Sequence, residues 1–573
     1  MATSNHKTRI RLLIGGIFLV TLIFGGRLFF LQIVEGADYG ELADRQYLRS
    51  ARTFFDRGSI YFSDRDGSLV PAATLKQEFL VTMNPQLVNS PGATYDFLVK
   101  ELTDLKKDEF LDLMKGERMY AEIADGVPKT VADNIMELDL KGVYVYKEKR
   151  RFYPAQRMAS HVLGFMAYRG ENYTGIYGLE KEYNKVLSHE EQGSFASFFA
   201  EIFLGFGDGV SAGVIGEGEV ILSIEPMVQR TVEDKLKETI DKWQADAGGV
   251  IVMDPLTGEI IAMAALPDFH PGEKQLDIKS LPNPLVERVF EMGSIVKPLT
   301  MAAGINEGLV NANTTYYDSG QVVLNNRVIK NHDKISHGTV TMQEVINNSL
   351  NTGAVFVMQK LGKERFRDYF LEGYGLGDKT GVDLPGEVSS LVDNIKSRRE
   401  VEYATASFGQ GIALSPIAMT RAFGVLASGG KLVTPHVVKS IKYDIGVTKD
   451  VEVEIVKSDV ISKKTTEEIT QMLVKAVDGS LQGGTAKLAH YAVAAKTGTA
   501  QMSKGDGGGY YADRYLHSFA GYYPAYNPKF VTFMYLVNPR QGRYSSDTLT
   551  EPFMSTAEFL LNYYEVSPDR AGS

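Results

Sequence analysis

The chain has 573 residues, more than a single hydrophobic core usually holds, so two or three domains are expected. Its residues are 44% hydrophobic and 23% charged, as in an ordinary globular protein, and the net charge of −10 gives no basic surface for nucleic acid. The absence of cysteine excludes disulfides and thiolate metal sites, but it does not indicate a compartment.

An apolar run covers residues 12–34 and is broken only by Arg27 and Gln32. It is long enough to cross the hydrocarbon core of a bilayer. Basic residues precede the run and acidic residues follow it, so the positive-inside rule places residues 1–11 in the cytoplasm. Because no small-residue cleavage site closes the run, we expect an uncleaved, single-pass membrane anchor with the body of the chain outside the cytoplasm.

Residues 35–215 contain no catalytic constellation, but they carry structural signals. Residues 57–60 followed by residues 64–67 predict a short strand and a hairpin-type turn. The charged side chains of this region, Arg151 and Glu180 among them, are interpreted as internal architecture, with solvated surface charges as the alternative.

Two other features of this region have competing interpretations. His161 is interpreted as a structural histidine, because no second histidine lies at metal-ligand spacing. A Phe-rich segment at residues 195–206 places its aromatic side chains at helical spacing. It predicts packing between domains, with a membrane-surface or partner contact as the alternative.

The remaining chain alternates strand-like and helical patterns. The strand-like segments are residues 219–224, 249–253, 259–263, 517–523 and 530–537, and the helical segments are residues 227–243, 417–427 and 551–563. Because strands come from both ends and surround a helical middle, one α/β domain with an antiparallel sheet is predicted.

Ser294 and Lys297 form a Ser-x-x-Lys motif behind Gly293, and an apolar helical segment follows them. Residues three apart share a helix face, so the lysine amine can reach the serine hydroxyl. The amine acts as a base only when neutral, which requires burial and a second cation to lower its pKa. The same spacing at Ser4–Lys7 precedes the apolar run, and at Ser428–Lys431 it contains a Gly-Gly turn.

Two more motifs follow downstream, Ser349-Leu350-Asn351 and Lys496-Thr497-Gly498-Thr499. The motif that begins at Lys496 comes directly after the strand-like residues 491–495, and it is predicted to end that strand. Another Lys-Thr-Gly, at residues 379–381, lies among glycines in a predicted loop. Lys496 is therefore the expected second cation.

The three motifs in this order resemble the triple signature of penicillin-binding proteins and serine β-lactamases. Further blocks resemble the class B penicillin-binding proteins, so the resemblance covers nearly the whole chain; they are residues 57–60, 150–154, 175–180 and 405–416. The sequence has Leu350 where the signature has Asp, Met292 where the family has Pro, and Ile295 where it usually has Thr. These departures affect the subtype more than the chemistry.

The resemblance implies a domain organisation and an α/β (α+β) fold. A cytoplasmic tail at residues 1–11 and a transmembrane helix at 12–34 would precede an elongated, non-catalytic α/β pedestal at 35–215. A transpeptidase domain with an antiparallel sheet flanked by helices would occupy 216–565, and a C-terminal tail 566–573.

The resemblance also implies acyl transfer at the D-Ala-D-Ala end of a peptidoglycan stem peptide, with β-lactams as inhibitors. Ser294 would be the nucleophile and neutral Lys297 the leading candidate for the base, an assignment that is disputed in related enzymes. Ser349 would relay a proton toward Lys297 and the departing amine. Asn351 would hold the substrate amide and Lys297.

The third motif would bind the substrate. Lys496, Thr497 and Thr499 would hold its terminal carboxylate, with Gly498 between them. The backbone N–H groups of Ser294 and Thr499 would form the oxyanion hole. No metal or organic cofactor is expected.

The residues around Ser294 and Ser349 look closer to septal, division-type enzymes than to elongation-type ones. The implied site of action is the outer face of the bacterial cytoplasmic membrane, with a polytopic glycosyltransferase and other division proteins as partners. The alternatives are an elongation-type transpeptidase, a D,D-carboxypeptidase, a β-lactamase and a non-catalytic membrane-anchored divisome scaffold. A β-lactamase needs a deacylating water and usually lacks a long pedestal.

Overall fold

The structure is a computed structural model of the chain, and it describes residues 56–116, 118–169, 172–188, 217–273, 277–505 and 508–570, with a few residues between 15 and 27. The Phe-rich segment at residues 195–206 lies outside the described residues, as does most of the apolar run at 12–34. Within these described ranges, no helix is both long enough and apolar enough to span a membrane. The predicted anchor therefore stays a prediction.

The chain forms two compact units, which are described separately: unit 1 with residues 1–57 and 75–151, and unit 2 with residues 58–74 and 152–573. In unit 1 the second half of β2 (Leu69–Met83) pairs antiparallel with β3 (Ala121–Val127), and β4 (Val143–Phe152) also pairs with β2. The helical elements are η2 (Pro85–Leu87), α3 (Pro91–Glu101), α4 (Lys107–Leu113) and α5 (Lys129–Glu137). Strand and helix side chains share one core, which includes Phe79, Val81, Leu98, Phe110 and Ile135.

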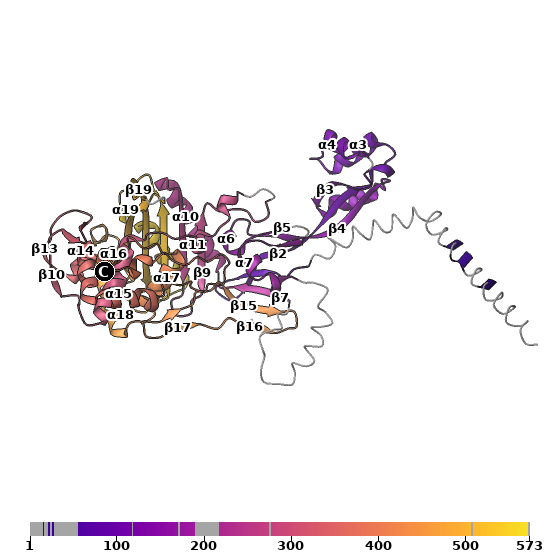
Figure 1. Ribbon diagram of the computed structural model, residues 1–573. Coiled ribbons are helices and arrows are strands. Elements are labelled where there is room, and N and C mark those ends of the chain that lie inside the picture. The colour runs from indigo at the N-terminus through magenta and orange to yellow at the C-terminus, as the bar shows by residue number, and fades with distance from the viewer. Residues whose placement is uncertain are drawn as a thin grey trace, which may run out of the picture. The chain divides into compact units, whose positions relative to one another are not determined.

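Unit 2 is built around a five-stranded antiparallel sheet in the order β18-β19-β20-β8-β9 (Figure 1). The strands are β8 (Ala247–Met253), β9 (Ile260–Leu266), β18 (Ala494–Ser503), β19 (Tyr510–Tyr523) and β20 (Phe530–Val537). Val531 of β20 lies opposite Met253 of β8, so strands more than 270 residues apart in sequence are neighbours. The predicted antiparallel sheet assembled from both ends of the region is confirmed.

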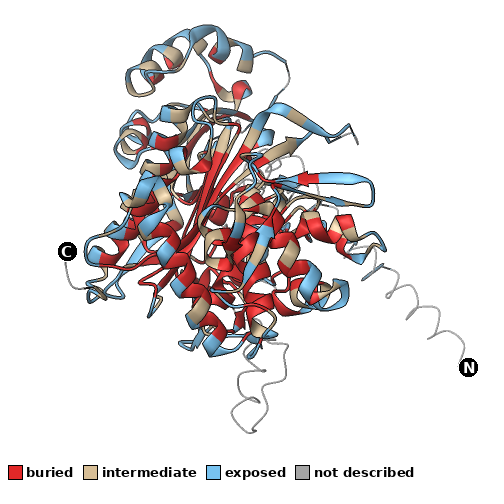
Figure 2. Cartoon of the chain, turned by 90° about the vertical axis from the view of Figure 1, so that its left-hand side faces the viewer, coloured by how far each residue is buried: buried red, intermediate tan, exposed pale blue. Residues whose placement is uncertain are grey.

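Helices cover both faces of this sheet because nearly every side chain of β20 and β8 and most of those in the second half of β19 are apolar and buried (Figure 2). Val250 and Val252 of β8 share a core with α10 (Pro226–Trp243) and α20 (Thr550–Tyr563). The alternate residues of β8 face a second core, which contains α12 (Lys297–Asn306) and α17 (Pro416–Ala427). The predicted helices at 227–243, 417–427 and 551–563 are thus present within one or two residues.

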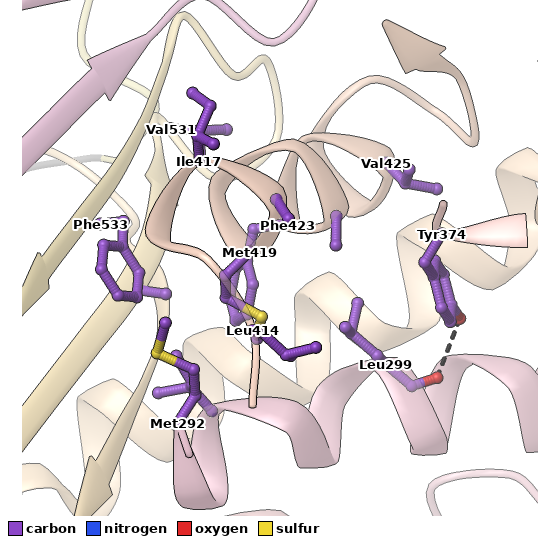
Figure 3. Packing of buried hydrophobic residues seen from close by; sticks show 14 of the residues in the cluster. Met292, Leu299, Tyr374, Leu414, Ile417, Met419, Phe423, Val425, Val531 and Phe533 are labelled. Atoms are coloured by element: carbon purple, nitrogen blue, oxygen red, sulfur yellow. Dashed lines mark hydrogen bonds between the residues drawn. The ribbon is translucent and has the colours of Figure 1, made fainter. Parts of the chain in front are cut away.

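The second core includes Met292, Ile295 and Val296, which flank Ser294 in sequence, and Figure 3 shows part of this core. Met292 packs there with Leu414, Met419 and Phe533, among other apolar side chains. The Tyr374 hydroxyl donates a hydrogen bond to the Leu299 carbonyl at 2.9 Å, which anchors the first turn of α12. The start of α12 is therefore held by tightly packed apolar side chains.

A second sheet in unit 2 runs β16-β15-β7-β1-β2. It contains β1 (Ile60–Ser63), the first half of β2, β7 (Gly218–Leu222), β15 (Val438–Tyr443) and β16 (Thr448–Asp450). The turn between β1 and β2 is closed by the Asp64 N–H, which donates to the Ser68 carbonyl at 2.9 Å, as the hairpin prediction requires. Tyr153 donates to the fully buried Glu180 carboxylate at 3.2 Å, and His161 Nε2 lies 2.9 Å from the Ser280 carbonyl. Glu180 and His161 are therefore internal, as interpreted from the sequence.

The other elements of unit 2 are short or surround the sheets. Near the start of the unit lie α6 (Ser160–Leu163), β5 (Met166–Arg169), β6 (Asn172–Gly175), α7 (Gly178–Glu182) and α8 (Asn184–Leu187). The remainder are η4 (Ile278–Ser280), α11 (Pro284–Glu287), η5 (Gly293–Val296), β10 (Thr315–Asp318), β11 (Gln321–Leu324), β12 (Arg327–Lys330), β13 (Gly338–Thr341), α13 (Met342–Asn347), α14 (Asn351–Leu361), α15 (Lys363–Asp368), η6 (Tyr369–Gly373), η7 (Asp393–Lys396), α16 (Glu400–Ala406), β14 (Leu432–Val433), β17 (Ile455–Lys457), α18 (Lys463–Gly479), η8 (Leu481–Gly484) and α19 (Ser545–Thr548).

One strand boundary differs from the prediction. Strand β18 begins at Ala494 and continues to Ser503, so Lys496 lies inside the strand and does not follow its end. The preceding residues are held by the C-terminal segment: Ala492 N–H donates to the Asp569 carboxylate at 2.7 Å, and the Tyr491 hydroxyl donates to a backbone carbonyl of the same segment. The Ala492 carbonyl accepts from the Ala525 N–H at 2.8 Å, so both backbone groups of Ala492 are satisfied outside the sheet ladder, which begins two residues later.

Candidate active site

Ser294 lies in the short 3-10 helix η5, and Lys297 is the first residue of α12. In a 3-10 helix, residues three apart eclipse one another, so this local form brings the two side chains together. Pro298 is tolerated because it occupies the first turn of α12, where its missing N–H needs no partner. The predicted approach is present: Lys297 Nζ lies 3.0 Å from Ser294 Oγ.

Two glycines permit the backbone approach that presents Ser294. Gly293 has a φ of +63°, and its N–H donates to the Gly409 carbonyl at 3.1 Å. Gly409 has a φ of +82°, and a Cβ there would lie 2.2 Å from the Gly293 carbonyl oxygen. Only a residue without a side chain fits at that contact. Gly409 lies within residues 405–416, one of the blocks on which the family resemblance rests, but no sequence pattern indicates its contact with Gly293.

Lys297 is almost completely buried, with 1% of its surface exposed, and its amine contacts three serine oxygens. Besides Ser294, it donates to the Ser349 carbonyl and lies 3.1 Å from the Ser349 hydroxyl. Burial first, and then the positive charge of Lys496, lower the pKa of the Lys297 amine well below its usual range. A neutral amine at this position is therefore expected near neutral pH.

Lys496 is also buried, and its amine donates to the Thr497 carbonyl at 3.1 Å. Burial lowers the pKa of Lys496 to about 8, so this side chain is still mostly charged at neutral pH. Burial lowers the pKa of both amines, and the charge of Lys496 lowers that of Lys297 further, which is the direction that the sequence interpretation requires. One can accept a proton, and the other can attract an anion.

A serine that the sequence analysis did not single out holds the third motif beside the Ser294 segment. The Ser518 hydroxyl contacts both the Met292 carbonyl, at 2.9 Å, and the Gly498 carbonyl, at 3.2 Å. A Cβ on Gly498 would lie 2.5 Å from this hydroxyl and 2.6 Å from the Met292 carbonyl. The strand predicted at 517–523 contains Ser518, but no sequence pattern indicates its partners.

Ser349 adopts a left-handed backbone conformation with a φ of +53°. This conformation is uncommon for a residue with a side chain. In this conformation both its carbonyl and its hydroxyl reach Lys297. Asn351 begins α14, and its amide donates to the Lys330 carbonyl at 2.9 Å. The predicted hold of Asn351 on Lys297 stays a prediction.

The three motifs line one cleft with a volume of about 810 Å³. Its lining includes Ser294, Ser349, Asn351, Lys496, Thr497 and Thr499, together with His332, Asp333, Lys334, His337, Arg543 and Tyr544. The second group comes from the loop after β12 and from the segment before α19, and the sequence motifs gave no sign of it. Thr499 accepts a hydrogen bond from the Ser545 N–H at 3.0 Å, which ties the third motif to that segment.

The repeated motifs are placed elsewhere in unit 2. The Ser428 hydroxyl donates to the Lys431 carbonyl at 2.7 Å and so closes a turn. Thr380 donates to the buried Glu387 carboxylate, and Gly381 has a φ of +82° in a loop. Neither copy lines the cleft. The Ser294 hydroxyl and the Lys496 amine line the cleft, and the buried Lys297 amine lies beside Ser294, so the site holds candidates for a nucleophile, an anion-binding group and a base.

Comparison with known protein families matches both parts of the chain. Residues 248–557 match the penicillin binding protein transpeptidase domain. Residues 55–195 match the penicillin-binding protein dimerisation domain.

Individual proteins are similar over most of the chain. Stage V sporulation protein D of Bacillus subtilis is 32% identical, over 97% of this chain and 85% of the relative. Peptidoglycan D,D-transpeptidase FtsI of Escherichia coli is 26% identical, over 98% of this chain and 92% of the relative. The solved structure of penicillin binding protein 3 from Mycobacterium tuberculosis in complex with aztreonam covers 90% of this chain and 98% of its own, with a TM-score of 0.67 and 24% identity.

Proposed function

The chain belongs to the penicillin-binding proteins with a transpeptidase domain, and we propose that it is a peptidoglycan D,D-transpeptidase acting through an acyl-enzyme on Ser294. The observation that carries the proposal is the buried amine of Lys297, which lies 3.0 Å from the Ser294 hydroxyl and also contacts the carbonyl and the hydroxyl of Ser349. The substrate is a stem peptide that ends in D-Ala-D-Ala, and β-lactams inhibit the enzyme.

In the first half-reaction the Ser294 oxygen attacks the carbonyl carbon between the two D-alanines, and its proton passes to the neutral Lys297 amine. The terminal D-alanine leaves after its nitrogen takes up a proton, which Ser349 relays from Lys297. In the second half-reaction the amine of another stem peptide attacks the ester carbonyl, and the proton that this amine loses returns to the Ser294 oxygen. A peptide bond forms, and Ser294 is regenerated.

The other motif residues have binding roles in this proposal. Lys496, with Thr497 and Thr499, attracts the terminal carboxylate, and Gly498 lets this strand approach the Ser294 segment. Asn351 holds the substrate amide. The backbone N–H groups of Ser294 and Thr499 stabilise the oxyanion, and one such donor is commonly worth about 3 kcal/mol. The charge of Lys496 and the position of all these residues on one cleft support these roles.

Product analysis tests the reaction. The protein is incubated with a D-Ala-D-Ala stem peptide as donor and a stem peptide with a free amine as acceptor, and the products are identified by mass spectrometry. The proposal requires cross-linked dimers with release of D-alanine. Release of D-alanine without dimers would indicate a D,D-carboxypeptidase, and no reaction with intact folding would indicate a scaffold.

A septal role in cell division is proposed from the similarity to FtsI of Escherichia coli and from the residues around the first two motifs. The similarity to Stage V sporulation protein D favours a second setting, a role in sporulation. Depletion of the protein distinguishes them: filamentous cells indicate division, and normal division with defective spores indicates sporulation. A polytopic glycosyltransferase and other division proteins are the proposed partners in the septal setting.

The proposed organisation keeps residues 12–34 as a membrane anchor, 35–215 as the pedestal and 216–565 as the transpeptidase domain. The charge asymmetry around the apolar run supports an extracytoplasmic catalytic domain. The two family matches, at 55–195 and 248–557, fall inside the pedestal and the transpeptidase domain respectively.

A further inference from the structure

Asp318 is a buried carboxylate close to the second motif, at the end of β10. It has no exposed surface, and both of its oxygens accept hydrogen bonds. Oδ1 accepts from the Gly320 N–H at 2.9 Å and from the Thr352 hydroxyl at 2.7 Å. Oδ2 accepts from the His337 N–H at 3.1 Å, and the Asn331 amide contacts both oxygens at 3.1 and 2.9 Å. Such a fully satisfied buried network fixes its members rigidly.

These donors come from parts of unit 2 that meet at the cleft. Thr352 is the second residue of α14, which packs against both β10 and β12, and α14 and β10 lie at the same end of the unit (Figure 1). Asn331 and His337 bound the loop whose residues His332 to Lys334 line the cleft. The Asp318 carboxylate therefore joins this loop to the start of α14.

The start of α14 depends on this outside support. Leu350 stands at the N-cap position and has no side chain that could cap the helix. The Thr352 N–H donates instead to the Asn331 side-chain oxygen at 3.2 Å, and the Asn351 amide donates to the Lys330 carbonyl at 2.9 Å. The first two residues of the helix are thus held by the end of β12.

Ser349 lies two residues before the helix in the left-handed conformation, where the backbone needs support from its surroundings. Its carbonyl and its hydroxyl both contact Lys297. A shift at the start of α14 is therefore transmitted to the contacts of Lys297.

We propose that Asp318 is a positioning residue for the second motif: through Thr352 and Asn331 it fixes the Ser349–Asn351 turn against Lys297 and against the cleft loop. The inference rests on the proposed function, because its readout is acylation of Ser294. It adds a residue that touches neither the substrate nor the nucleophile. A misplacement of about 1 Å in such supporting structure can lower a reaction rate on the order of a hundredfold.

Two substitutions separate this role from general stability. Asp318→Asn removes the charge, and either orientation of the new amide places an NH₂ group against N–H donors. Thr352→Val removes the hydroxyl that links the carboxylate to α14 and also contacts the Tyr316 hydroxyl and the Asn331 side-chain oxygen, while Thr352→Ser retains all three contacts. The control is Glu387→Gln, since Glu387 is another buried carboxylate that accepts from backbone and hydroxyl donors but does not line the cleft.

The measurement is single-turnover acylation of the full chain by a fluorescent penicillin, at saturating concentration and expressed per titrated active site. A positioning role predicts that Thr352→Val lowers the acylation rate constant by about tenfold or more, while the titre of active sites stays full. The rate constants of Thr352→Ser and Glu387→Gln should stay within about threefold of the wild-type value. Asp318→Asn, where it folds, is expected to match Thr352→Val or be slower. Any other pattern overturns the inference.

The wild-type measurement distinguishes failure of the proposed function from failure of the proposed role of Asp318. If the wild-type protein forms no adduct on Ser294, the proposed function fails. If the wild type reacts and Thr352→Val reacts as fast, only the role of Asp318 fails.

Discussion

Replacement of Lys297 by arginine tests the proposed base through a hydrogen-bond count. A neutral amine has two N–H donors and one lone pair. The structure gives Lys297 three partners: the Ser349 carbonyl, the Ser349 hydroxyl and the Ser294 hydroxyl. If the two N–H groups donate to Ser349, the lone pair is left for the Ser294 proton, which is the arrangement that a general base needs.

Lys297→Arg keeps the positive charge but cannot supply this lone pair, because guanidinium stays protonated up to a pH above about 12. General-base catalysis contributes roughly 10²- to 10⁴-fold to a rate, so we expect the acylation rate constant to fall by about 10³-fold or more. Lys496→Arg is the matched control, since it retains the charge that the site uses. Its loss should stay near 10- to 100-fold, which corresponds to one misplaced charged hydrogen bond of about 1.5 to 3 kcal/mol.

Both rate constants are measured against the same penicillin by stopped-flow fluorescence, after thermal unfolding has shown that both variants fold. If Lys297→Arg acylates as fast as Lys496→Arg, or faster, Lys297 is not the base. Ser349 would then become the better candidate.

Three further predictions follow from the same geometry. The acylation rate should rise with pH as Lys297 loses its proton and fall again near pH 8 as Lys496 loses its own. In Lys496→Arg the decrease near pH 8 should disappear. If the decrease remains in that variant, it belongs to another group. Gly409→Ala should lower the free energy of unfolding by about 1 to 3 kcal/mol and also slow acylation, because its Cβ would meet the Gly293 carbonyl. Gly429→Ala is the control: Gly429 has a φ of +77°, but a Cβ there would have no atom within 4 Å, so this variant should lose less stability and acylate at the wild-type rate. Equal effects of the two variants on acylation would refute the contact argument. Protease added to intact spheroplasts should digest the catalytic domain, whereas digestion only after lysis would contradict the proposed topology.

The sequence predicted the parts of the fold that depend on local patterns. The helices at 227–243 and 551–563 follow from apolar periodicity, and the hairpin around residues 64–67 follows from its turn residues. The approach of Lys297 to Ser294 also follows from local geometry, since three-residue spacing brings side chains together in any helical form.

The contacts that complete the site join segments far apart in sequence, and no local pattern shows them. Ser518 bridges to Met292 across 226 residues, and Asp318 reaches Thr352 across 34. The left-handed backbone of Ser349, which turns its carbonyl toward Lys297, is unfavourable locally and persists only because its surroundings hold it. The strand boundary at Ala494 was missed for the same reason, since Asp569 satisfies the preceding backbone.

The most direct measurement of the central claim is peptide mass spectrometry of the protein after incubation with a penicillin. The account predicts one covalent adduct, on the peptide that contains Ser294, and no adduct in Ser294→Ala, which should fold normally because only a hydroxyl is removed. An adduct on any other serine, or labelling that persists in Ser294→Ala, would contradict it.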